Sequence, residues 1–181
     1  PYQPSVLFGR NAIGASNVSF TQSKGEGLYR RSLYTYWKRQ IPAANIRILG
    51  ADGRNSCHTR RERTNTPLQA LVLLNDPQFV EAARTFAERT IREGGKSAKE
   101  RIAFAFRLAT SRKVTGKELR ILLAEYRDRL AEFQSNKKSA KAYLSGGGER
   151  PAPADIESAE LAAIAAVMSL ILNLDESISK S

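Results

Sequence analysis

Four arginines that precede one predicted helix have the type and spacing best suited to binding chemistry. The planar guanidinium group suits bidentate contact with phosphate, sulfate or carboxylate groups. The next helix is expected to begin at Thr66, where free backbone amides and the positive end of the helix dipole would favour an anion. The candidate anion-binding or partner-binding residues are therefore Arg54, Arg60, Arg61, Arg63 and Asn65.

The same arginines also have a structural interpretation, which we favour. Arginine side chains often organise loops by pairing with carboxylates, and Glu26, Asp76 and Glu81 could serve as partners. In that case the arginine segment would hold the N-terminal arm against the helices and would not bind a ligand.

Cys57 and His58 are the only cysteine and histidine in the chain. Structural zinc usually takes four Cys or His ligands, and covalent haem attachment needs a Cys-x-x-Cys-His motif. A Cys–His dyad is disfavoured because adjacent side chains of an extended segment point to opposite faces. We predict no metal and no cofactor in this chain and name no catalytic residue. A role for His58 as a non-covalent ligand, or for Cys57 as a nucleophile, stays open.

The composition is strongly basic. Lys and Arg number 29 against 18 Asp and Glu, which gives a net charge of +11. Such an excess favours polyanionic partners, but the charges are spread along the chain, as on a solvated surface. Aromatic residues interleave with basic ones at Tyr29, Tyr34, Tyr36 and Trp37. They could stack on single-stranded nucleic acid, yet their spacing suits one face of an amphipathic helix, so nucleic acid is not the partner we favour.

Helix-start signals indicate how the chain must position these residues. Thr66, Pro67 and Gln69 supply an N-cap, a proline at the first helical position and a capping-box glutamine. Asp76 and Pro77 repeat the cap-and-proline signal for the next helix. Two further capping boxes, each followed by a periodic apolar run, begin at residues 97 and 115. The inner face of the helix after Asp76 is expected to carry Phe79, Ala83, Phe86, Thr90 and Ile91.

These signals predict a mainly α fold, a five- to six-helix bundle with an extended N-terminal arm and an irregular arginine-rich loop. We expect one domain over residues 1–181. Its parts are an arm over 1–27, a first helix over 28–41, an irregular loop over 42–65, helices over 66–134, a flexible loop over 135–154 and a C-terminal core helix over 155–175. Ile46 and Ile48 permit a short strand within the irregular loop. The apolar run over 161–172 is too short to span a bilayer, so no membrane span is expected.

Three segments resemble the planctomycete PSD-one domain of unknown function. They are LYRRSLYTYWKR over 28–39, the run over 60–84, and the closing LNLDE over 172–176. The resemblance extends over nearly the whole chain from Tyr2. Ser23 and Gly50 stand where relatives usually have Asp, and His58 stands where they usually have a small or β-branched residue.

The resemblance implies the C-terminal part of a large exported protein that often carries a cytochrome c-like domain upstream. It therefore implies a periplasmic or cell-surface location and haem in an upstream domain. It supplies no catalytic residues. The chain has no signal peptide and begins without Met, which we interpret as a processed chain or an excised domain.

Our leading functional hypothesis is an accessory domain, not an enzyme by itself, that docks to the upstream domains through or near the arginine loop. The alternative is a basic module that binds polyanions, with anionic glycan preferred over nucleic acid. A third hypothesis is an enzyme site shared with the neighbouring domains. A cleft that holds a carboxylate beside His58 or the arginine loop would favour the third.

Overall fold

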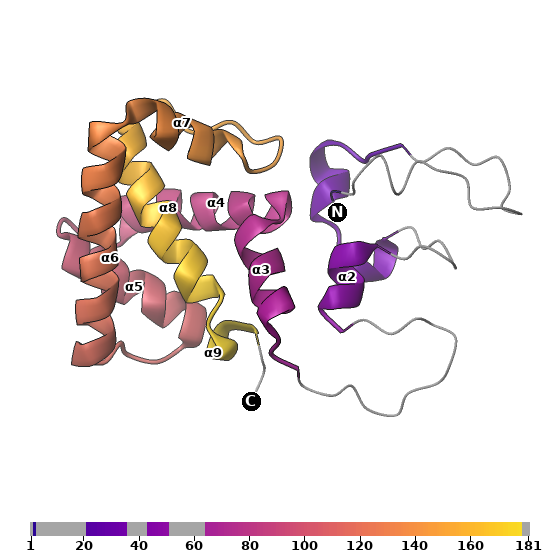
Figure 1. Ribbon diagram of the computed structural model, residues 1–181, viewed down its shortest axis with the longest axis horizontal. Helices are drawn as coiled ribbons and strands as arrows, with labels where there is room; N and C mark the ends of the chain where they lie inside the picture. Colours follow the sequence, from indigo (N-terminus) through magenta and orange to yellow (C-terminus); the bar gives the residue numbers. More distant parts are fainter. Residues whose placement is uncertain (1, 3–20, 36–42, 51–63, 179–181) are drawn as a thin grey trace, which may run out of the picture. The chain divides into compact units, whose positions relative to one another are not determined.

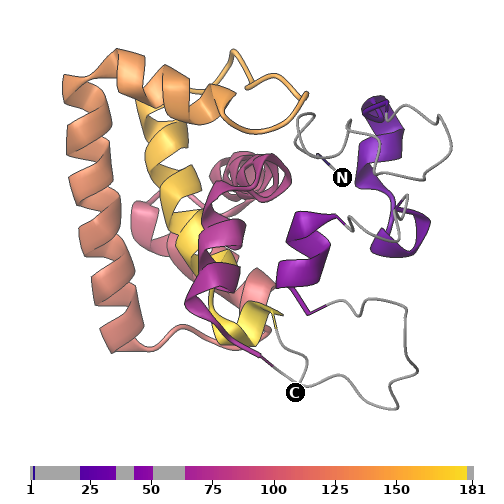
Figure 2. The same cartoon turned by 45° about the vertical axis from the view of Figure 1, so that its right-hand side comes forward.

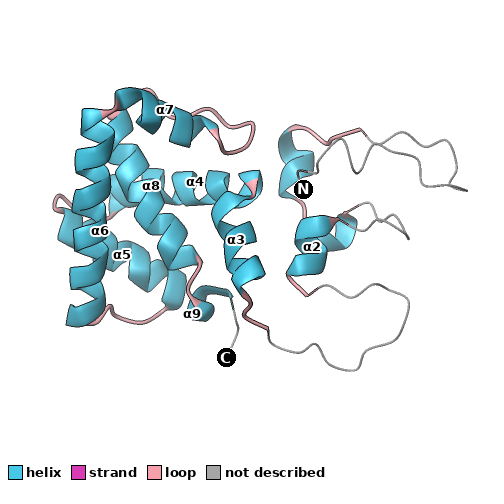
Figure 3. Ribbon diagram, in the orientation of Figure 1, coloured by secondary structure: helices cyan, strands magenta, loops and turns pink. Residues whose placement is uncertain are grey.

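The computed structural model describes residues 2, 21–35, 43–50 and 64–178. The chain divides into two compact units, Pro1–Val72 and Leu73–Ser181, and each is described by itself. The described residues are mainly helical and contain no strand, as coloured in Figure 3. The predicted mainly α class is therefore confirmed.

The described part of the first unit consists of short elements. They are the 3-10 turns η1 (Gly25–Tyr29) and η2 (Ser32–Tyr34), the helix α2 (Ala44–Ile48) and the start of α3 (Pro67–Asn75). Leu28 and Ala43 are fully buried.

The prediction of an α-helix over 28–41 is wrong for its described residues. Arg30 and Arg31 have extended backbone, with ψ angles of 150° and 146°, and they separate the two 3-10 turns. Ser, Thr and Tyr are weak helix formers, and this segment carries several of them in a row. Leu33 and Tyr34 are exposed and do not pack inward. Tyr36 and Trp37 lie outside the described residues.

The irregular segment also differs from its prediction. Residues 44–48 form a short helix, so the strand that Ile46 and Ile48 would permit is absent. The side chain of Asn45 accepts a hydrogen bond from the Ile46 amide at 2.9 Å, within the first turn. Most of the predicted arm over 1–27 lies outside the described residues.

The second unit contains the long helices. They are α4 (Pro77–Glu93), α5 (Ala98–Thr110), α6 (Gly116–Ser135), α7 (Lys137–Ser145), α8 (Ser158–Leu172) and α9 (Asp175–Ile178). The predicted helical region over 66–134 is confirmed by α3 through α6. The expected number of five or six helices is not confirmed, because the described residues hold α2 through α9, of which α2 and α9 are very short.

Helix α8 forms the centre of this unit, as the sequence predicts. It packs against α4, α6 and α7 and also contacts α5 and α9. Figures 1 and 2 show that it runs roughly antiparallel to α6. Its small residues, Ala159, Ala162, Ala163 and Ala165, are buried and let neighbouring helices approach closely. The helix begins at Ser158, three residues later than expected, and a turn at Asn173 separates it from α9.

The prediction of a loop over 135–154 is wrong for residues 137–145, which form α7. Asn136 caps this helix by accepting a hydrogen bond from the Ser139 amide at 3.1 Å. Ala140 and Leu144, one helical turn apart, are buried in the core. Among the described residues no helix combines the length and the apolar character that a membrane crossing requires.

Candidate functional site

The structure does not test the main predicted site. Arg54, Arg60, Arg61 and Arg63 lie outside the described residues, and so do Cys57 and His58. Asn65 is described and exposed. Whether the arginines bind an anion, contact a partner or pair within the chain stays a prediction.

The predicted cap at Thr66 and Gln69 is present. The Thr66 amide donates to Oε1 of Gln69 at 3.0 Å, and the Gln69 amide donates to Oγ1 of Thr66 at 3.3 Å. The Gln69 Nε2 group also donates to the Ile48 carbonyl at 2.9 Å and to the Thr64 hydroxyl at 2.7 Å. Only 7% of Gln69 is exposed. This one buried side chain therefore joins α2, the end of the arginine segment and the start of α3.

The cap at Asp76 and Pro77 is also present. Asp76 accepts a hydrogen bond from the Gln78 amide at 2.9 Å, and Pro77 occupies the first helical position. Thr66, Pro67 and Gln69 therefore form the start of α3, and Asp76 and Pro77 form the start of α4, in the structural roles that the sequence predicted.

A buried charged group on α4 was not predicted. Arg84 is 3% exposed and Glu88 is 4% exposed, on the face of α4 that also buries Ala83 and Ala87. The Arg84 guanidinium donates to the Leu144 carbonyl at 2.7 Å and to the Arg150 carbonyl. Arg150 in turn donates to Glu88 at 3.2 Å, and Nε of Arg84 lies 3.9 Å from Oε1 of Glu88. Arg84, Glu88 and Arg150, here called the Arg84 cluster, fix the segment that joins α7 to α8.

The glycines of that segment pack directly against α4. A Cβ atom on Gly147 would lie 2.7 Å from the Glu81 amide nitrogen. Gly148 has a φ of +59°, and a Cβ there would overlap the Glu81 carboxylate. The sequence predicted a flexible loop here, but Gly147 and Gly148 each occupy a position where a Cβ atom would meet α4.

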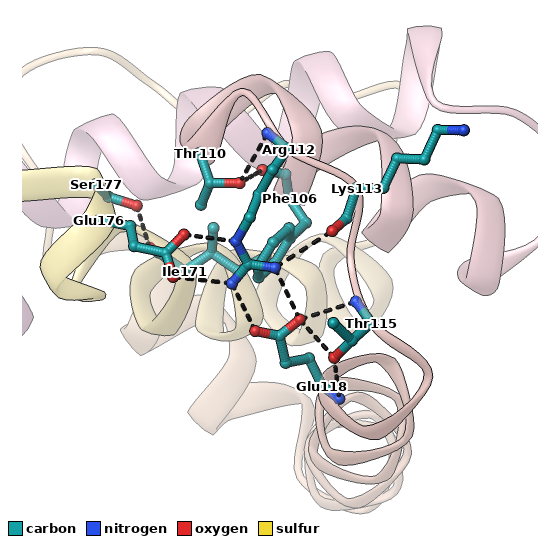
Figure 4. Close-up of polar contacts among 9 residues, drawn as sticks. All are labelled: Phe106, Thr110, Arg112, Lys113, Thr115, Glu118, Ile171, Glu176 and Ser177. Atoms are coloured by element: carbon teal, nitrogen blue, oxygen red, sulfur yellow. Dashed lines mark hydrogen bonds and ion pairs between the residues drawn. The ribbon is translucent and has the colours of Figure 1, made fainter. Parts of the chain in front are cut away.

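A second charged group joins α5, α6 and α9 (Figure 4). Arg112 donates to Glu118 at 2.6 Å and to Glu176 at 2.7 Å, and its guanidinium lies 4.7 Å from the centre of the Phe106 ring. The bonds from Arg112, together with those from Thr115, lower the pKa of Glu118 to about 2. Arg112 also lowers the pKa of Glu176. Ser111 adopts the left-handed conformation, with a φ of 62°, and so turns the chain toward this cluster.

Helices α6, α7 and α8 form an apolar groove of about 510 Å³. Here called the α6–α8 groove, it is lined mainly by Leu74, Phe133, Ala142, Tyr143, Ala166 and Leu170, with Ser139 and Ser169 between them. The rings of Phe133 and Tyr143 lie 5.7 Å apart, and burial raises the pKa of Tyr143.

Charged residues stand along one side of the groove. Arg129 donates to Glu125 at 2.7 Å and to Glu132 at 2.9 Å, and all three residues line the groove. Two carboxylates thus share one guanidinium, so this side carries a net negative charge on a chain whose net charge is +11.

A smaller pocket of about 300 Å³, here called the basic pocket, lies beside the Arg84 cluster. It is lined by Lys141, Leu144 and Ser145 of α7, by residues 147–152 of the connecting segment, by Ser158 of α8 and by Arg84. Within the described ranges no group of three His, Cys, Asp or Glu residues is placed to hold a metal ion.

Comparison with known proteins identifies the family. The model for PSD1, a family of proteins of unknown function (DUF1553), matches residues 1–126. The chain therefore belongs to this family, as the resemblance of its segments predicted. No curated protein and no solved structure matches the chain.

Proposed function

For this member of a family of unknown function, we propose an accessory domain that binds other domains of a larger exported protein and performs no catalysis by itself. The observation that carries this proposal is the α6–α8 groove. It combines an apolar floor with one charged side, which is the arrangement of a protein-binding surface with a hydrophobic centre and a polar rim.

The chemistry of the groove points to its occupant. Leu170 is 40% exposed and Leu74 is 39% exposed, so apolar side chains of a partner would bury surface already open to water. The carboxylates of Glu125 and Glu132 outnumber the guanidinium of Arg129, which favours a partner with a Lys or Arg beside its apolar residues. We propose an amphipathic, basic segment of an upstream domain as the occupant.

The charged residues of the second unit support binding over catalysis. Glu88, Glu118 and Glu160 each accept a hydrogen bond from an arginine. These carboxylates are committed to ion pairs that hold the fold together, which is a structural role. The third hypothesis, a shared enzyme site near His58, concerns residues outside the described ranges and stays a proposal.

The test uses the chain and the remaining domains of its parent protein, expressed as separate polypeptides. We expect them to associate, and we expect Leu170→Glu to weaken the association at least tenfold because the carboxylate would be buried beside Glu125 and Glu132. Leu108→Glu is the matched control, since Leu108 is 42% exposed on α5 and does not line the groove. Equal effects of the two substitutions, or no association, would contradict the proposal.

The second candidate function is polyanion binding, in which anionic glycan is the preferred ligand. Lys137, Lys138 and Lys141 are exposed on α7, and they form no ion pair with another described residue. Binding to a sulfated glycan should weaken steeply as salt rises, whereas docking through the apolar groove, which has only a few charged pairs at its edge, should weaken much less. Titration of the chain with a sulfated glycan and with the other domains of the parent protein, each at two salt concentrations, distinguishes polyanion binding from docking.

A further inference from the structure

The basic pocket contains hydrogen-bond donors that have no partner among the described residues. Lys141 has no hydrogen-bond or ion-pair partner among the described residues, and neither does the hydroxyl of Ser158. Arg150 commits Nη2 to Glu88 and leaves its other donors without a described partner. A pocket with unpaired hydrogen-bond donors suits a ligand that carries several hydrogen-bond acceptors.

The start of α8 adds further donors to the same pocket. Ser158 is the first residue of this 15-residue helix, and its N-cap, Glu157, makes no side-chain hydrogen bond to the first turn. The free amides at a helix start, together with the positive end of the helix dipole, favour an anion. This contribution reinforces the lysine and arginine, which line the pocket independently of it.

The Arg84 cluster gives the pocket a fixed wall. The Arg84 guanidinium donates to the carbonyl of Leu144, in the last turn of α7, and to the carbonyl of Arg150, within the connecting segment. Because they lack a Cβ atom, Gly147 and Gly148 allow that segment to lie directly against α4. Arg84 is therefore a positioning residue, and a ligand would meet Lys141, Arg150 and Ser158. Among the described residues that line the pocket, Glu149 alone carries a carboxylate, and it opposes an anion at that side.

We propose that the basic pocket binds a phosphate or sulfate group carried by a small molecule. A tetrahedral oxyanion offers several acceptors to the ammonium, guanidinium and hydroxyl groups. The volume of about 300 Å³ exceeds that of a single oxyanion and falls at the lower end of the range for small-molecule sites. The ligand would therefore be an ester, such as a phosphorylated or sulfated sugar.

This inference goes beyond docking and does not depend on it. The pocket and the α6–α8 groove share no lining residue. The pocket is also built mainly by residues after 126, beyond those that match the family model.

The experiment titrates the intact chain with inorganic phosphate, inorganic sulfate, a hexose phosphate, a hexose sulfate and the unmodified hexose, and follows amide shifts by NMR. We expect both esters to bind, the hexose to show no binding, and the free anions to bind more weakly than their esters. Lys141→Ala should weaken ester binding about tenfold. Lys138→Ala, on the same helix but outside the pocket, should change it less than about twofold.

Ser158→Ala provides a second variant, which should weaken binding without a change of net charge. Leu170→Glu in the groove should leave ester binding unaltered, so failure of docking and failure of this site can be told apart. No binding of any oxyanion by the native chain would overturn the proposal. Equal losses in the Lys138 and Lys141 variants would also overturn it, since they would indicate diffuse attraction to the basic surface.

Discussion

Nε of Arg112 lies 2.7 Å from Oε2 of Glu176, which joins the turn after α5 to the last helix, α9. The helix has only four residues and could not persist alone, because isolated helices of that length are unstable in water. Its position therefore depends on this ion pair and on the packing around it.

Arg112→Ala should release α9 from the second unit. The substitution removes the bonds to Glu118 and Glu176 and the contact with the Phe106 ring. Hydrogen exchange at the amides of Leu174 and Ser177 should then accelerate markedly, while exchange in α4 changes little. Arg127→Ala, an exposed residue of α6 with no described partner, is the control. Unchanged exchange in α9 would show that packing alone holds it.

The depressed pKa of Glu118 predicts the acid sensitivity of this cluster. The pKa falls from 4.5 to about 2 in the folded chain, so the ionised form is stabilised by folding. The ionised Glu118 therefore contributes fully to stability at pH values above its pKa in the unfolded chain. This contribution is lost as the pH falls through its pKa in the folded chain. Glu118→Gln should therefore lower the melting temperature at pH 7, and the difference from the native chain should shrink between pH 4.5 and about 2. A difference that does not vary with pH would contradict the assignment.

Arg84→Met should strongly destabilise the second unit. The substitution leaves two carbonyls without their donor and removes the cation that lies 3.9 Å from the buried Glu88, which keeps only its bond from Arg150. Loss of one partner of a buried pair costs about 3–5 kcal/mol. Arg89→Met is the control, because Arg89 forms an exposed pair with Glu93 at the same i, i+4 spacing. The control should lower the free energy of unfolding by about 0.3–0.5 kcal/mol. Urea denaturation measures the free energy of unfolding of both variants. Equal losses would show that the buried Arg84 contributes no more to stability than the exposed Arg89.

Gly148→Ala should destabilise the same unit by more than about 1 kcal/mol, since alanine is strained at a φ of +59° and its Cβ would overlap Glu81. Gly116→Ala places the same methyl group in open space at the start of α6, where it should be neutral or mildly stabilising. Thermal unfolding of the two variants tests the close packing of the segment. Similar melting temperatures would mean that the segment can move away from α4.

Gln69→Ala should destabilise the first unit. The change removes the capping acceptor of Thr66 and leaves the Ile48 carbonyl and the Thr64 hydroxyl without a donor. Loss of buried hydrogen bonds of this kind costs about 1–3 kcal/mol. Gln69→Glu keeps the acceptor and loses the donor, so it separates the two roles. Amide exchange at Ala70 reports the result, and native-like protection in both variants would contradict the importance of this side chain.

The helix starts could be predicted from the sequence because their cause is local. Ser97 with Glu100, and Thr115 with Glu118, both form the reciprocal bonds of a capping box. Each pair lies within a single turn, so no knowledge of tertiary structure is needed to recognise it. The central position of α8 was also predictable, since its apolar and small residues cover almost its whole circumference.

The Arg84 cluster could not be predicted in the same way. Its partners, the carbonyls of Leu144 and Arg150, lie 60 and 66 residues along the chain. A charged residue on an amphipathic helix usually faces water, and the sequence offers no local sign that this one is buried. The spacing of Glu81, Arg84 and Glu88 does place them on one face of α4, which was the available signal.

Helix α7 was missed because polar residues and three glycines surround a weak apolar pattern. Ala140, Tyr143 and Leu144 supply its inward face. The basic pocket and one wall of the α6–α8 groove are built from α7, so neither could be predicted without that helix.

The most direct measurement of the docking proposal is a hydrogen-exchange footprint of the chain with and without the other domains of its parent protein. Binding in the α6–α8 groove predicts added protection over residues 139–143 and 166–170, with little change along α5. Protection confined to other elements, or no protection in either groove wall, would contradict the proposal.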